Sequence, residues 1–424
     1  MSGFVTLTAQ NGELFSNNSS VGSGTGSFQY LVTSSSNIEI DTDAIMTIYN
    51  NNPQYKYNAL GSGLNRPVRS LALDSNNNLY VGGNFTRAGD ILANNIAKWN
   101  GSTWSALGDG LNDSVTSLAL DSNNNLYVGG YFTQAGGIPA NNIAKWNGST
   151  WSALGGGLNG SVTSLALDSN NNLYVGGYFT DAGGIPAHYI AKWSGSTWYA
   201  LGGGLNGSVT SLAFDSNNNL YVGGIFTRAG GKTSHNIAKW NGSTWSALGG
   251  GLNGPGTSLA LDSNNNLYVG GYFTDAGGIP AHNIAKWSGS TWYALDNGLD
   301  DSVSSLAFDS NNNLYVGGYF RYAGGILANH IAKWNGSTWS ALDNGLDDSV
   351  KSLAFDSNNN LYVGGDFTHA GGILANNIAN LETNTSVDIH INNNYISTLV
   401  SNQFQCVNYY KSNGYIYKTT QGYR

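Results

Sequence analysis

The sequence predicts an all-β protein: a seven-bladed β-propeller of four-stranded antiparallel blades. The decapeptide Asp-Ser-Asn-Asn-Asn-Leu-Tyr-Val-Gly-Gly occurs seven times without a change, at a spacing of 47 residues. Each unit holds four short β-prone runs, which is the pattern of one propeller blade. The composition agrees, because 59 Gly residues disfavour helices, whereas 12 Trp and 40% hydrophobic residues can fill a core. The decapeptides start at Asp74, Asp121, Asp168, Asp215, Asp262, Asp309 and Asp356.

The unit at residues 112–158 shows how each strand is predicted. Its first run ends at the turn-forming cluster Asp-Ser-Asn-Asn-Asn. Its second run contains Gly129 and Gly130, where a side chain would obstruct a neighbouring backbone. After a loop at residues 133–142, the third and fourth runs form a tight hairpin across Asn-Gly-Ser-Thr. The four runs are residues 115–120, 126–132, 143–146 and 151–154.

The chain ends predict that the ring closes. Residues 55–65 align with the fourth strand of a unit, with Tyr57 where the second Trp stands, while the seventh unit lacks this strand. Pairing the two segments removes the exposed edges that an open solenoid, the alternative, would have to protect. The third strand of this blade is either residues 378–381 or residues 46–49.

This arrangement divides the chain into three parts. We expect an N-terminal β-rich extension at 1–44, a propeller at 45–381 with its closing strand near 55–60, and a C-terminal β-rich extension at 382–424. Closure makes both extensions emerge at one blade, where they would form a small attachment module.

Charge and cysteine content exclude several classes of protein. The net charge is −8 with no basic block, so nucleic acid is not expected as a partner. Cys406 is the only cysteine, which excludes an intrachain disulfide and a cysteine metal cluster. The sequence has no recognisable signal peptide and no apolar run of membrane-spanning length, so membrane insertion is not expected.

The repeat resembles the kelch repeat of β-propellers. Kelch repeats carry a glycine doublet after hydrophobic residues and a later Tyr and Trp, and here Leu-Tyr-Val-Gly-Gly precedes a pair such as Trp146 and Trp151. The Asn- and Gly-rich units also resemble propeller repeats in bacterial surface proteins and large DNA viruses. The resemblance covers residues 46–381, with Trp in place of the kelch Tyr and a shorter gap. It implies a propeller and favours a virion or cell surface over the cytoplasm.

The units differ from one another mainly on one face of the predicted disc. The turns between first and second and between third and fourth strands barely vary, whereas the loops on the opposite face do. This aromatic and polar face would suit a protein or a glycan; the alternative is drift of unconstrained loops. The candidate residues are Tyr131, Tyr178, Tyr272 and Tyr319 after the Gly doublet, and Arg87, Asp181, Arg228, Asp275, Tyr322 and His369 three positions later.

Metal and cofactor signals are weak. The Asp-x-Asn-x-Asn opening resembles a calcium loop, but Leu at position six and Phe at position 12 favour a plain turn. The column of His188, His235 and His282 lies on separate blades, too far apart for one metal ion. No cofactor is predicted, and Ca²⁺ has only weak candidate ligands in loops that otherwise read as solvated. These are Asp296, Asp300, Asp301, Asp343, Asp347 and Asp348.

The sequence contains no catalytic constellation. A nearly sevenfold ring also lacks the one divergent blade that an active site normally requires. The paired Trp residues are expected to pack between blades rather than to stack on sugars. The sequence therefore predicts a non-enzymatic structural or protein-binding scaffold, with the partner on the variable loops or the terminal extensions. A carbohydrate-binding lectin is the first alternative and a propeller-type glycosidase the second.

Overall fold

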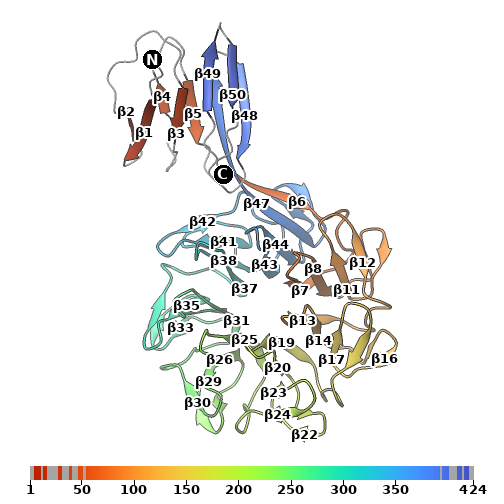
Figure 1. Ribbon diagram of the computed structural model, residues 1–424. Coiled ribbons are helices and arrows are strands. Elements are labelled where there is room, and N and C mark those ends of the chain that lie inside the picture. The colour runs from red at the N-terminus through yellow and green to blue at the C-terminus, as the bar shows by residue number, and fades with distance from the viewer. Residues whose placement is uncertain are drawn as a thin grey trace. The chain divides into compact units, whose positions relative to one another are not determined.

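The computed structural model describes residues 55–382 with their side chains, together with the backbone of strands outside that range. The described part contains β-strands and no helix, and residues 57–382 form one compact unit. In this unit seven antiparallel blades surround a common centre (Figure 1). The predicted fold class is confirmed.

Each blade has four strands, counted here from the centre outward. The first strands are β7 (Val68–Leu73), β13 (Val115–Leu120), β19 (Val162–Leu167), β25 (Val209–Phe214), β31 (Gly256–Leu261), β37 (Val303–Phe308) and β43 (Val350–Phe355). The second strands are β8 (Leu79–Gly83), β14 (Leu126–Gly130), β20 (Leu173–Gly177), β26 (Leu220–Gly224), β32 (Leu267–Gly271), β38 (Leu314–Gly318) and β44 (Leu361–Gly365). The third strands are β11 (Ile96–Trp99), β17 (Ile143–Trp146), β23 (Ile190–Trp193), β29 (Ile237–Trp240), β35 (Ile284–Trp287), β41 (Ile331–Trp334) and β47 (Ile378–Ile391). The fourth strands are β12 (Trp104–Ala106), β18 (Trp151–Ala153), β24 (Trp198–Ala200), β30 (Trp245–Ala247), β36 (Trp292–Ala294), β42 (Trp339–Ala341) and β6 (Gln54–Ala59).

A short two-stranded hairpin lies between the second and third strands of every blade, in the segment predicted as loop. Its strands are only two residues long, too short to give a periodic pattern in the sequence. The hairpins are β9–β10 (Arg87–Ala88, Ile91–Leu92), β15–β16 (Gln134–Ala135, Ile138–Pro139), β21–β22 (Asp181–Ala182, Ile185–Pro186), β27–β28 (Arg228–Ala229, Lys232–Thr233), β33–β34 (Asp275–Ala276, Ile279–Pro280), β39–β40 (Tyr322–Ala323, Ile326–Leu327) and β45–β46 (His369–Ala370, Ile373–Leu374).

The Gly doublet at the end of each second strand allows close packing in two directions. A Cβ on Gly130 would overlap the carbonyl oxygen of Ser114 in the same blade. A Cβ on Gly129 would overlap the side chain of Val162 in the next blade. The doublet therefore holds both the first strand and the neighbouring blade against the second strand.

The N-terminal segment closes the ring. Residues 378–381 of β47 pair with β44 and supply the third strand of the seventh blade, and β6 pairs with β47 as the fourth (Figure 1). This resolves the open choice of third strand, because β5 (Met46–Asn50) pairs instead with residues 387–391. The hydroxyl of Tyr57 donates to the Leu342 carbonyl at 3.2 Å, as the second Trp of other blades does.

The second Trp of each hairpin joins its blade to the preceding one. The Trp99 and Trp104 rings lie 5.1 Å apart, and Trp104 Nε1 donates to the Leu60 carbonyl at 3.0 Å. Trp339 Nε1 donates in the same way to Leu295, across the blade junction. The Trp pairs are thus part of the packing between blades, as predicted.

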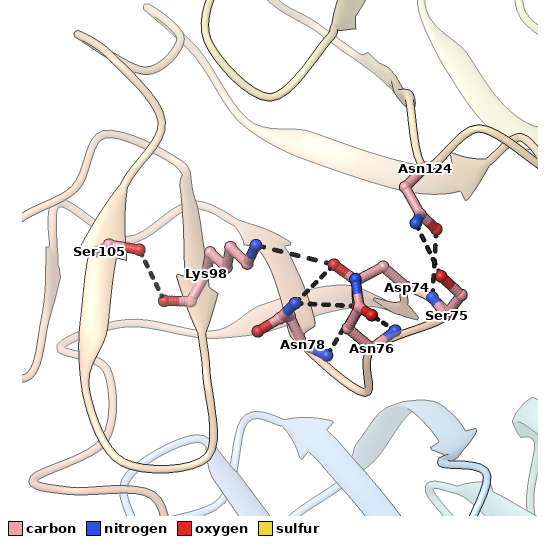
Figure 2. Close-up of polar contacts among 7 residues, drawn as sticks. All are labelled: Asp74, Ser75, Asn76, Asn78, Lys98, Ser105 and Asn124. Carbon is pink, nitrogen blue, oxygen red and sulfur yellow. Dashed lines mark hydrogen bonds and ion pairs between the residues drawn. The ribbon is translucent and has the colours of Figure 1, made fainter.

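The Asp-Ser-Asn-Asn-Asn sequence is a self-contained turn, shown for the first blade in Figure 2. Asp74 Oδ1 accepts the backbone N–H groups of Asn76 and Asn78, both at 2.9 Å, and Oδ2 accepts the Asn78 side-chain amide. Lys98 Nζ, from the third strand, lies 3.7 Å from Oδ2 and 5.1 Å from the centre of the Tyr80 ring. The carboxylate therefore accepts the backbone N–H bonds of a turn, as predicted, and also pairs with the lysine.

The remaining residues of the turn bind the next blade. Ser75 N–H donates to Asn124 Oδ1 at 3.1 Å, and Asn124 Nδ2 donates back to Ser75 Oγ at 2.8 Å (Figure 2). Asn124 sits in the left-handed region at φ 59°, which Asn tolerates better than most residues. Asn77 makes the same pair with Ser357, so this chain of turns also closes.

A third set of hydrogen bonds joins the first strands. Leu118 N–H of the second blade donates to Ser70 Oγ of the first at 3.0 Å, and Leu71 N–H donates to Ser352 Oγ at 3.1 Å to complete the circle. We call the inner Leu–Ser bond, the Ser–Asn pair and the outer Trp or Tyr bond together the seam between blades. Every seam uses residues that scarcely change between units.

The second compact unit comprises residues 1–56 and 383–424. Its backbone forms a sheet in the order β2 (Glu13–Ser16), β1 (Phe4–Gln10), β3 (Ser27–Tyr30), β49 (Asn408–Ser412), β50 (Tyr415–Thr419). Further strands are β4 (Ile38–Ile40), which pairs with β5, and β48 (Asn394–Val400), which pairs with β47. The side chains of these strands, Cys406 and the predicted attachment role lie outside the described residues.

Tyr57 offers a direct test of ring closure. Tyr57→Phe removes one hydrogen bond and should lower the free energy of unfolding by about 1 kcal/mol. Tyr57→Ala also leaves a cavity and should cost about 3–5 kcal/mol. Tyr57→Trp places the residue of the other six blades there and should retain stability. Urea denaturation measures all three, and an unchanged midpoint for Tyr57→Ala would contradict closure by this segment.

Asn124 tests the seam between turns. Asn124→Gly keeps the left-handed backbone but loses the bonds to Ser75, so it should destabilise by about 1 kcal/mol. Asn124→Ala adds the strain of a Cβ in that region and should cost about 1 kcal/mol more. Asn123→Ala, one residue earlier and exposed, is the control and should melt like the native protein. Equal melting curves for the three variants would refute this role for the seam.

Candidate binding face

The two faces of the propeller use their polar groups differently. On the turn face, Asn100 Oδ1 accepts the N–H groups of Ser102 and Thr103, and the Asp turns bind one another. The opposite face carries the short hairpins and the segments between blades, and we call it the variable face. The sequence candidates for binding all lie there, as the predicted topology requires.

The residue after the Gly doublet forms an exposed arc on the variable face. Tyr131 N–H donates to the Ser114 carbonyl just before the first strand, which places this column beside the inner strands. The following Phe132 is fully buried, so strand alternation exposes Tyr131. We call the five exposed apolar residues, from 47% to 66% accessible, the aromatic arc: Tyr131, Tyr178, Ile225, Tyr272 and Tyr319.

The second candidate column starts the short hairpins. Arg87, Arg228, Tyr322 and His369 are exposed. Asp181 and Asp275 are half-buried, and their carboxylates accept the N–H groups of Gly184 and Gly278 at 2.8 and 2.9 Å. These two carboxylates therefore stabilise their own hairpins.

Lys351 is a residue of this face that the sequence reasoning missed. Its Nζ lies 2.9 Å from Asp366 Oδ2 and 3.7 Å from the centre of the Tyr319 ring, with the side chain 7% exposed. Asp366 Oδ2 also accepts a hydrogen bond from Ser349 Oγ at 2.9 Å. The signal was present, because blades two to five have Thr where this blade has Lys. A cation thus covers Tyr319, and the arc is uncovered over blades two to five.

The acidic segments serve the backbone. Asp300 Oδ1 accepts the N–H groups of Arg321 and Tyr322 at 2.9 and 2.8 Å, a role that Asn65 has in the first blade. Asp301 and Asp348 accept the N–H of the following serine, and Asp296 and Asp343 have φ of 50° and 55° where other units have Gly. No group of three or more His, Cys, Asp or Glu side chains that could hold a metal ion occurs within residues 55–382.

Asp347 is the acidic residue with a strongly shifted pKa. Partial burial raises its pKa, but hydrogen bonds from His369 and Thr368 outweigh this effect and lower the pKa to about 2. Thr368 Oγ1 lies 2.6 Å and His369 Nδ1 3.1 Å from Asp347 Oδ2. Both carboxylate oxygens of Asp347 are therefore occupied by the protein's own groups.

A groove of about 740 Å³ lies on the variable face between the fifth and sixth blades. Its lining brings together two predicted candidates, Tyr272 and Tyr322, with His282 and Asp300. Pro255, in the position that Ser holds in most other units, and Asn297 complete the polar and apolar rim. Asp300 is also one of the weak candidate metal ligands from the sequence. The remaining candidates do not line this groove, although Asp275, Tyr319, Asp296 and Asp301 belong to the same two blades or to the segment between them.

No helix in the described residues is long and apolar enough to cross a membrane.

Solved structures with the same fold share little sequence with this chain. The WD40 beta propeller domain of Doa1 is 15% identical with a TM-score of 0.53, over 78% of this chain and 96% of that one. YCF48 bound to D1 peptide is 15% identical with a TM-score of 0.51, over 78% and 97%. At these identities the likeness establishes the fold alone.

A third similar structure is the extracellular domain of the putative one component system BT4673 from B. thetaiotaomicron. It is 14% identical with a TM-score of 0.53, over 77% of this chain. This chain spans only 39% of the length of that domain. A search of curated protein sequences found no match.

One family model matches most of the chain. The model of the Rax2 C-terminal beta propeller domain matches residues 46–147, 92–183, 152–296 and 282–420. The segments overlap because near-identical units align with the model in several registers. The kelch-like subtype stays a prediction. The chain belongs to the family of the Rax2 C-terminal beta propeller domain.

Proposed function

We propose that the protein is a non-enzymatic scaffold that binds a partner protein through the aromatic arc. The observation that carries this proposal is the exposure of large apolar side chains at the same position in five consecutive blades, from 47% to 66%, all on the variable face. Clustered exposed apolar residues mark interaction sites more often than isolated ones do. Tyr is also enriched in binding surfaces, because it gives much contact area for little conformational entropy.

The buried residues on either side of each arc residue favour binding. Each arc residue follows a strand with all residues buried, such as β14, and precedes a buried Phe, so its backbone is fixed before a partner arrives. Such preorganisation reduces the entropy lost on association. The fold likeness to YCF48, whose structure was solved bound to D1 peptide, supports peptide binding by a propeller.

A non-enzymatic role is part of the proposal. The carboxylates of Asp181 and Asp275 accept hydrogen bonds from their own hairpins, and that of Asp347 accepts hydrogen bonds from Thr368 and His369, so all three have structural partners. Placement at a cell or virion surface belongs to the same proposal and rests on the resemblance to surface-protein repeats. The fold likeness to an extracellular domain is consistent with it.

A lectin is the second candidate. The groove beside Tyr272 combines an exposed ring with the polar side chains of His282, Asn297 and Asp300. Sugars bind to such combinations of aromatic rings and polar groups. The arc would then hold a glycan in place of a peptide.

Binding by the arc can be tested with residues that the protein itself uses elsewhere. Peptides would be selected on the full chain from a random phage library, and their affinities measured by isothermal titration calorimetry. The triple variant Tyr131→Asn, Tyr178→Asn and Tyr272→Asn uses the Asn that stands at this position in the first blade. It should weaken binding by about tenfold or more, because interface Tyr residues commonly contribute over 1 kcal/mol each.

The control is the pair Tyr199→Ser and Tyr293→Ser. Both residues are 51% exposed on fourth strands, where other blades have Ser, and the variant should bind peptide normally. Equal losses in both variants would reject the arc as the site. A glycan array on the same proteins would identify a lectin if sugar binding falls only in the arc variant. Hydrolysis of a glycan that one carboxylate substitution abolishes would overturn both readings.

A further inference from the structure

We propose that the groove between the fifth and sixth blades binds a basic side chain, arginine or lysine, of the partner protein. The inference rests on the proposed function and names the chemistry that part of the partner must have. The groove brings the rings of Tyr272 and Tyr322 together with the carboxylate of Asp300. Aromatic faces and a carboxylate are the groups that a guanidinium or ammonium ion prefers.

The carboxylate has an oxygen available for a ligand. Asp300 Oδ1 accepts the N–H groups of Arg321 and Tyr322, so the side chain is fixed in place. Within residues 55–382, no hydrogen bond or ion pair reaches Oδ2. The guanidinium of Arg321 does not pair with Asp300, although the two backbones are adjacent. A ligand cation can therefore pair with Oδ2 without displacing an existing bond.

The two tyrosines give the groove its cation-binding walls. Tyr272 is 66% exposed and Tyr322 is 47% exposed, and both line the groove. A cation within about 6 Å of such a ring is attracted by its negative face. The long aliphatic stem of Arg or Lys would pack against the same rings.

The next junction shows what these positions attract. The equivalent residues between the sixth and seventh blades are Tyr319 and Asp347, each 47 residues later. There the protein fills both positions itself: Lys351 Nζ lies 3.7 Å from the Tyr319 ring centre, and His369 Nδ1 lies 3.1 Å from Asp347 Oδ2. A Tyr and an Asp at these two positions thus bind nitrogen-bearing groups in this molecule.

The groups that fill the later junction have no counterparts at the groove. Ser304 stands in place of Lys351, Arg321 in place of Thr368, and Tyr322 in place of His369. The groove therefore keeps the Tyr and the Asp. His282 and Arg321 lie nearby, but within residues 55–382 neither side chain makes a hydrogen bond or ion pair with Asp300. This difference is the reason to assign a ligand cation here and not at the sixth–seventh junction.

The surrounding charge favours the same ligand. Asp296, Asp300 and Asp301 lie in one segment of the chain beside the groove and outnumber the one adjacent cation, Arg321, and the whole chain carries a net charge of −8. A local negative potential raises the rate at which cations arrive and disfavours anionic ligands.

The test compares peptides that differ in charge but not in shape. Acetyl-Gly-Arg-Gly-amide, its lysine analogue and its neutral citrulline analogue would be titrated into the full-length protein and followed by NMR. We expect the arginine and lysine peptides to bind about tenfold or more tightly than the citrulline peptide, because a charge-assisted bond to Asp300 is lost in the neutral analogue. Equal binding of the arginine and citrulline peptides, or binding of none, would overturn the proposal.

The variants again come from other blades. Asp300→Asn places the Asn of the first five blades there, which keeps the Oδ1 acceptor, and should abolish the preference for arginine over citrulline. Tyr322→Gln, with the residue of the second blade, should weaken binding of both peptides. Asp347→Asn is the matched control at the next junction and should leave binding unchanged. Retained preference in Asp300→Asn, or an equal loss in Asp347→Asn, would rule the groove out.

The outcome is separable from that of the proposed function. If peptides selected on the aromatic arc bind normally to the Asp300→Asn variant, the arc binds a partner but the groove does not bind a basic side chain of that partner. If the small arginine peptide binds the groove while no peptide is selected on the arc, the proposed function fails and the cation site stands.

Discussion

The seam between neighbouring blades is the constraint on which the rest of the propeller depends. A ring of seven blades closes only if each blade meets the next at nearly the same angle. An error in this angle, repeated in every seam, would leave the last blade unable to meet the first. The molecule fixes this angle at three radii: Leu118 N–H to Ser70 Oγ at the inner strands, Asn124 with Ser75 at the turns, and Trp104 Nε1 to the Leu60 carbonyl at the outer strands. Apolar packing alone tolerates rotation, whereas hydrogen bonds have narrow preferred distances and angles. The invariance of the decapeptide follows from this geometry, because most of its residues belong to a strand core, the turn or a seam.

The same constraint confines variation to one face. Ser and Asn on the turn face are committed to the neighbouring blade, so substitution there would break a seam. On the variable face, the side chains of Arg87, Asp181 and Asp275 bond to their own hairpins, so these positions can change blade by blade without changing the angle between blades. A binding site that differs around the ring is therefore physically compatible with the variable face and not with the turn face. The restriction of variation to the variable face therefore follows from contacts within this one chain.

The fold could be predicted almost completely from the sequence, and the site only in outline. Repeats of 47 residues, turn formers and the spare strand at Tyr57 are local or periodic signals, and they led to the blades and the closure. Pairings between different blades leave no such signal. Contacts between strands of one blade can leave none either: the ion pair of Lys98 with Asp74 was not predicted, because the two residues are distant in the sequence and meet only through strand pairing. The choice between residues 378–381 and 46–49 for the third strand depended on pairing between the two ends of the chain. The columns of the variable face were identified, but the groove was not, since its walls come from two blades.

A residue that differs from its equivalents in the other blades can be interpreted by comparison with those blades. An Asp on a loop is not informative by itself. Asp300, however, stands where five blades have Asn, and its Oδ1 accepts the same two backbone N–H bonds as the Asn Oδ1, so its Oδ2 remains available. Lys351 stands where Thr is usual, and the acidic partner Asp366 stands where Tyr is usual, so the two changes compensate within one blade. Beside Asp300, Arg321 stands where every other blade has Thr, but within residues 55–382 no ion pair joins the Arg321 guanidinium to Asp300. Asp300 is exposed, so a partner protein can reach its carboxylate, and a cation at this junction would take the place that the protein's own groups fill at the next one.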